Sequence, residues 1–220
     1  MKPRILLLAL LACATPAYST DGSVITSDEA SRALRDGLYQ GTRASLSRLG
    51  RENGYFGNPR VKIGLPKNFA RAEGVLRSLG LGKEVDDLIL AMNRTAEAAV
   101  PEVSDLMQQA VRRLSIDDAK ALLAAGDGAT TAWFRKNTEA QFDEKLAPLV
   151  HAAAERGDLV RAYNAMAGKL ALLARIKSDR ATVEDYVDHR ALDGFYTLLA
   201  EEEHSIRMRR PGGKVFGMPN

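Results

Sequence analysis

Apolar residues recur at helical spacing along almost the whole chain. Between residues 85 and 100 they fall three or four positions apart, and the same pattern restarts after Pro101. Similar stripes cover residues 142–153, 159–170 and 183–199. Strand-like alternation is confined to residues 61–65, just before Pro66. The pattern predicts an all-α fold, a single-domain bundle of about eight or nine helices.

Polar and glycine residues mark the expected ends of these helices. Capping-box spacings predict starts at Thr26 with Glu29, Ser115 with Asp118, Thr138 with Gln141, and Thr182 with Asp185. Stops are expected at Gly50, Gly80, Gly126, Gly157 and Pro211. Pro101 suits the first turn of a new helix, and Pro148 predicts a kink or a division. The last long helix should run from about Thr182 to Arg209, with Glu203 and Arg207 paired on its outer face.

One long connection, near residues 51–66, separates the first helices. Long ordered loops inside compact domains are often functional, and this one carries aromatic side chains beside basic ones. Tyr, Trp and Arg also dominate interface hot spots. The candidate binding surface therefore comprises Tyr55, Phe56, Asn58, Arg60, Lys62, Trp133 and Arg135. The competing interpretation is that the aromatic side chains cap the core.

The first residues have the pattern of a secretory signal peptide. Lys2 and Arg4 precede an apolar run at 5–14, which ends before Pro16 and small residues. That run is shorter than the roughly 20 apolar residues that span a bilayer, and no later segment reaches this length without charges. We expect residues 1–19 to be a signal peptide, residues 20–220 to form one helical domain in the periplasm, and no transmembrane span.

A second processing route remains open at Cys13. Residues 10–13 resemble a lipobox, and cleavage before Cys13 would leave a lipidated cysteine that attaches the protein peripherally to the envelope membrane. Under the soluble route the mature chain contains no cysteine, because Cys13 is the only one in the sequence. No disulfide is then available, so stability must come from burial of apolar surface.

The charge balance argues against a nucleic-acid partner. The chain has 31 basic and 28 acidic residues, and removal of Lys2 and Arg4 lowers its formal net charge from +3 to +1. Nucleic-acid-binding proteins usually show a clear basic excess.

A set of short motifs occurs in an order that is similar to a known bacterial family. They are NPRVKI at 58–63, LGLG at 79–82, MNR at 92–94, DAK at 118–120, TAWFR at 131–135, ALDGF at 191–195 and EEE at 201–203. From about Ala33 to Gly217 the chain resembles the domain of unknown function family 4197. The resemblance implies an exported, largely helical Gram-negative envelope protein, and it supplies no catalytic residues. His204 stands where the family pattern usually has Lys.

Few residues are arranged for metal or nucleophilic chemistry. Glu201 and His204 have the Glu-x-x-His spacing of di-iron bundles, but such bundles use it twice, and His151 and His189 lack the preceding Glu. We therefore expect no metal, with Glu201 and His204 as the weak alternative. Residues 80–83 follow a helix, so they indicate a turn and no phosphate loop. No nucleophile elbow is present, and no cofactor is expected.

Three functional hypotheses follow. The first is a non-catalytic binding or protein-interaction module of the envelope, with an unknown envelope protein as partner. The second is a carrier of an apolar small molecule or lipid, enclosed by alanine-rich helix faces and by Met92, Met107 and Met166. The third is a metal-dependent enzyme using Glu201 and His204. A cavity of several hundred cubic ångströms would favour the carrier, and a filled interior would favour the interaction module.

Overall fold

The computed structural model describes residues 26–174 and 180–208, which form seven α-helices and no strand. The helices are α1 (Ser27–Leu49), α2 (Lys67–Ser78), α3 (Gly82–Arg112), α4 (Ile116–Ala125), α5 (Ala129–Arg156), α6 (Leu159–Ala174) and α7 (Arg180–Met208). The predicted all-α fold is confirmed. The predicted signal peptide and Cys13 lie outside the described residues. None of the described helices has the length and apolar character needed to cross a membrane.

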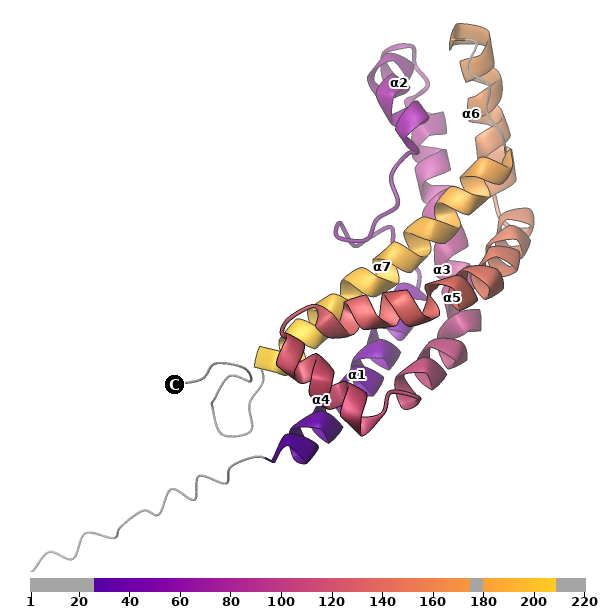
Figure 1. Ribbon diagram of the computed structural model, residues 1–220. Coiled ribbons are helices and arrows are strands. Elements are labelled where there is room, and N and C mark those ends of the chain that lie inside the picture. The colour runs from indigo at the N-terminus through magenta and orange to yellow at the C-terminus, as the bar shows by residue number, and fades with distance from the viewer. Residues whose placement is uncertain (1–25, 175–179, 209–220) are drawn as a thin grey trace, which may run out of the picture.

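The most extensive helix–helix contacts of the bundle are those of α5 with α7 and of α5 with α3. α1 packs against α3, α4 and α7, while α5 packs against α3 and α7, and α6 packs mainly against α3. Figure 1 shows an elongated molecule with α2, α6 and the start of α7 at one end and α1 and α4 at the other. The ring of Phe69 in α2 meets that of Tyr163 in α6 edge to face, with centroids 5.9 Å apart, which joins the tips of that first end.

The apolar stripes read from the sequence form the core. In α7 the six positions expected to point inward are all at most 2% exposed: Val183, Val187, Ala191, Phe195, Leu198 and Leu199. The stripes of α3 and α5 face the same cluster. Burial of these faces, and not helix propensity, supplies most of the stability of such helices.

The described residues form seven helices, fewer than the eight or nine predicted, because α3 continues through Pro101 and α5 continues through Thr138 and Pro148. Pro101 lies inside α3 and Pro148 inside α5. Each proline removes one backbone donor, but Val100 and Val103 on either side of Pro101 are both buried in the core, so packing holds the helix together. Thr138 lies inside α5, where its hydroxyl donates to the carbonyl of Phe134 at 2.6 Å.

The interpretation of Glu203 and Arg207 as a surface pair is wrong. Both side chains are buried, and their ion pair is 2.8 Å long. The Glu203 carboxylate accepts from the backbone N–H groups of Thr130 and Thr131 at the start of α5. Arg207 donates to the carbonyls of Leu122 and Leu123 near the end of α4. The pair thus satisfies two helix ends at once, each with the charge that its dipole favours.

This arrangement predicts a loss of stability in acid. Burial alone would raise the pKa of Glu203, but hydrogen bonds from Arg207, Thr131 and Thr130 outweigh it and hold the pKa below its ordinary value. A lowered folded pKa means that the contribution is complete above about pH 4.3, the unfolded pKa, and is lost as the pH falls through the folded pKa. Urea unfolding of Glu203→Gln should therefore depend less on pH than that of the wild type in this range. Equal slopes would contradict the prediction.

The connection at residues 51–66 is held down by side chains from α3 and α7. Buried Glu97 accepts from the backbone N–H groups of Tyr55 and Phe56, at 2.9 and 3.0 Å. The side chain of Asn93 accepts from the N–H of Ile63 and donates to its C=O. It thus makes the hydrogen bonds that a neighbouring strand would make with the strand-like segment 61–65. Gly194 of α7 allows the close approach, because a Cβ there would lie 2.6 Å from Cε1 of Tyr55.

Candidate functional site

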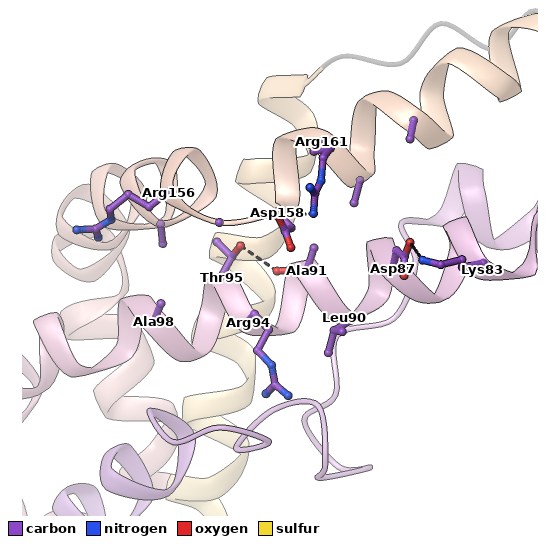
Figure 2. A pocket seen from close by; sticks show the side chains of 14 residues that line it. Lys83, Asp87, Leu90, Ala91, Arg94, Thr95, Ala98, Arg156, Asp158 and Arg161 are labelled. Atoms are coloured by element: carbon purple, nitrogen blue, oxygen red, sulfur yellow. Dashed lines mark hydrogen bonds and ion pairs between the residues drawn. The ribbon is translucent and has the colours of Figure 1, made fainter.

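A cleft of about 840 Å³ lies between α3 and the junction of α5 with α6 (Figure 2). Its lining comprises Lys83, Asp87, Leu90, Ala91, Arg94, Thr95 and Ala98 from α3, and Ala153, Arg156, Gly157, Asp158, Arg161, Ala162 and Ala165 from the facing segment. Its volume lies within the range of about 300–1,000 Å³ typical of small-molecule sites.

The facing walls of the cleft are built from small side chains. Ala91 and Ala98 on α3 oppose Ala153, Ala162 and Ala165 on α5 and α6. An alanine side chain ends at its Cβ. Two helices that face each other with alanines can therefore lie near each other and still leave space between their side chains. The cleft therefore presents small apolar side chains between its charged and polar lining residues.

The turn that shapes the cleft is short and well anchored. The Gly157 N–H donates to the carbonyl of Ala153, which ends α5. The carbonyl of Asp158 then accepts from the Ala162 N–H at 2.8 Å, which starts α6. Leu159 between these two bonds is fully buried and fixes the turn on the core. Beyond the cleft, Lys169 of α6 pairs with Glu84 of α3.

The rim of the cleft is charged, and most of its charges are paired locally. Lys83 contacts Asp87 at 2.6 Å, and this hydrogen bond raises the pKa of Lys83. Arg161 contacts Asp158 at 2.7 Å. Arg156 differs, because its Nε donates to the Ala152 carbonyl and no carboxylate pairs with it among the described residues. Among the described lining residues, Arg156 is therefore the cation without a carboxylate partner, and in Figure 2 its side chain extends away from Asp158 and Arg161.

Arg94 is engaged with the loop at residues 51–66. Its guanidinium contacts Glu97 and, on the loop, Glu52 and Asn53. In Figure 2 its side chain projects from α3 on the side away from Asp158 and Arg161. Arg94 therefore links the wall of the cleft to the loop.

The polar side chains of the cleft lining mostly contact one another or the backbone. None of its fourteen residues is His, Cys or Ser, and its one hydroxyl, on Thr95, donates to the carbonyl of Ala91 within the same helix. The lining therefore contains no serine or cysteine beside a histidine of the kind used in nucleophilic catalysis. What it offers is an apolar surface, cations and space.

The loop residues of the predicted binding surface differ in their burial and in their contacts. Tyr55 is fully buried and its hydroxyl donates to the Ala191 carbonyl, so it belongs to the core. Phe56 is partly buried beneath Lys62, whose Nζ lies 4.1 Å from the ring centroid. The side chain of Asn58 accepts from the Arg60 N–H inside the loop. Arg60 itself reaches Glu201 of α7 at 2.9 Å.

The other two residues of that surface also pack against the fold. Trp133 is partly buried on the core and meets Phe134 edge to face. Arg135 lies 4.5 Å from the ring centroid of Tyr196 and pairs with Asp193. Arg60 and Arg135 thus both contact α7, at positions eight residues apart, or about 12 Å along the axis.

Glu201 and His204 are directed to different partners. Glu201 faces Arg60 of the loop, whereas the Nδ1 atom of His204 lies 2.8 Å from Asp127, in the turn between α4 and α5. The three methionines of the carrier hypothesis are buried at 2% exposure or less, and none lines the cleft.

A family model described as "Protein of unknown function (DUF4197)" matches residues 24–212. The chain belongs to the DUF4197 family. No curated protein and no solved structure matches it. Several of the short sequence motifs contribute to the framework of this DUF4197 chain. Asn93 and Arg94 anchor the loop, Gly194 leaves room for Tyr55, and Glu203 joins α7 to α5.

The DUF4197 cleft itself was missed by reasoning from sequence. Its acidic and basic residues look like an ordinary solvated helix face, and its alanines look like good helix formers. The one available signal was the recurrence of alanine at 91, 98, 153, 162 and 165, at or beside otherwise bulkier apolar stripes. Recurring alanines indicate a close approach between helices only when it is known which helices pack together.

Proposed function

We propose that this protein is a non-catalytic binding protein of the bacterial envelope. In this proposal the α3–α6 cleft holds an elongated small molecule with an apolar body and one anionic group. The observation that carries the proposal is the cleft of about 840 Å³ with alanine walls and Arg156 on its rim. The envelope location rests on the signal-peptide pattern of residues 1–19.

The chemistry of the lining supports this class of ligand. Alanine walls favour an apolar chain by burial of its surface but offer it few directional contacts. Lys83, Arg156 and Arg161 outnumber Asp87 and Asp158 around the rim, so an anionic group is favoured over a cationic one. A guanidinium also binds carboxylate or phosphate in a bidentate manner.

The same features separate this proposal from the two simpler hypotheses. The volume of the cleft favours the carrier among the hypotheses from sequence, but the ligand would lie in an open cleft and not in an enclosed cavity, because the methionines expected to line such a cavity are packed in the core. A protein-interaction surface centred on exposed aromatics has less support, because Tyr55 is buried and Phe56 and Trp133 are partly buried. An open cleft accommodates a small molecule without either feature.

Binding of a fluorescent long-chain fatty acid to the protein of residues 20–220, with palmitate as competitor, tests the proposal. Ala165→Trp fills the cleft and Arg156→Ala removes its available cation, so each should weaken binding by about tenfold or more, or at least 1.4 kcal/mol. The matched controls are Ala140→Trp on the exposed face of α5 and Arg43→Ala on α1, outside the cleft.

Two outcomes would overturn the proposal. The first is saturable binding that survives Ala165→Trp unchanged, which would place the ligand elsewhere. The second is absence of binding for the fatty acid and for a long-chain alkyl phosphate. An equal loss of affinity in Arg156→Ala and Arg43→Ala would show that binding depends on the net charge of the protein and not on Arg156 itself.

A further inference from the structure

A second polar cluster lies between α5 and α7 and shares no residue with the cleft. It contains Asp143 of α5 and the consecutive residues Asp188 and His189 of α7. One potential ligand atom from each residue lies within 4.8 Å of the other two. The Nδ1 atom of His189 and the Oδ1 atom of Asp143 are 3.6 Å apart.

Two carboxylate oxygens in this cluster are buried without a hydrogen-bond partner among the described residues. They are Oδ1 of Asp188 and Oδ1 of Asp143. Asp188 as a whole is only 4% exposed. A buried carboxylate is expensive unless a donor or a cation satisfies it, and a second carboxylate beside it adds repulsion. Burial and the neighbouring Asp143 accordingly raise the pKa of Asp188 to about 8.

We propose that Asp143, Asp188 and His189 form a binding site for one divalent first-row transition-metal cation. Two carboxylate oxygens and one imidazole nitrogen form a donor set that suits Zn²⁺, Mn²⁺ or Fe²⁺. The imidazole makes Mg²⁺ and Ca²⁺, which prefer oxygen ligands, poorer candidates.

The geometry requires only small movements to hold such an ion. Ligands about 2.0–2.1 Å from a tetrahedral zinc are about 3.3–3.4 Å from one another, close to the present separation of His189 and Asp143. The exposed side chain of His189 can rotate inward, while buried Asp188 is fixed. The exposed side of the cluster leaves room for water to complete the coordination shell.

Such an ion would connect α5 and α7 through their side chains. It would neutralise the two adjacent carboxylates and occupy the unpartnered oxygens. The site therefore acts first on stability, and its failure would leave the proposed cleft function untouched.

Calorimetric titration of the chelator-treated 20–220 protein with ZnCl₂ and with MnCl₂ tests the site, and thermal unfolding provides a second readout. We expect one ion per chain and, at 100 times Kd, a rise in Tm of about 5–10 °C. Asp188→Asn and His189→Ala should each weaken binding by at least about tenfold.

His151→Ala is the matched control, because His151 faces Glu184 across the same two helices at 2.7 Å. This variant should bind the ion as the wild type does. Loss of binding in His151→Ala with retention in Asp188→Asn would place the ion at the wrong cluster and overturn the proposal. A wild type that takes up neither ion would also overturn the proposal.

Discussion

Replacement of Glu203 by Ala should lower the free energy of unfolding by about 3–5 kcal/mol, the range for breaking a buried ion pair. The substitution leaves buried Arg207 without its counter-ion and leaves the N–H groups of Thr130 and Thr131 without their acceptor. Urea unfolding of the 20–220 protein, followed by circular dichroism, measures the change.

Glu202→Ala is the matched control, since its neighbouring carboxylate lies 4.0 Å from Arg48 and is partly exposed. Its effect should stay below about 1 kcal/mol. The double variant Glu203→Leu, Arg207→Leu should remain destabilised, because leucine satisfies neither helix end. Full recovery of the free energy of unfolding in the double variant would show that the two charged side chains matter only for their mutual ion pair and not for the helix ends.

Replacement of Glu97 by Ala should lower the free energy of unfolding by about 2–4 kcal/mol, because two buried N–H groups lose their acceptor. Those groups belong to Tyr55 and Phe56, and Arg94 loses a partner as well. Hydrogen exchange should accelerate most in the loop at residues 51–66. Glu102→Ala, an exposed position on the same helix, is the control and should change neither measurement. An unchanged loop in Glu97→Ala would contradict this account.

Much of the fold could be predicted from residue periodicity alone. The buried positions of α7 were predicted correctly, because each apolar side chain there is favoured in one environment only, the core. The number of helices was not, because a proline signals a missing donor but not the packing that tolerates it, as at Pro101 and Pro148.

Polar residues proved harder to place than apolar ones. Glu203 and Arg207 have the spacing of a surface pair, and only the tertiary fold brings the ends of α4 and α5 against them. The aspartates at 143 and 188 are 45 positions apart, and no local pattern predicts that they meet. The cleft depends in the same way on how α3 and α6 are paired.

The segment at residues 61–65, whose sequence alternates like that of a strand, affects behaviour at high concentration. A lone strand-like segment with free backbone groups is a template onto which another chain can add and start aggregation. Here Asn93 occupies both groups of Ile63, and the hydroxyl of Tyr186 donates to the carbonyl of Gly64. Two side chains thus occupy backbone groups through which this segment could otherwise pair with another chain.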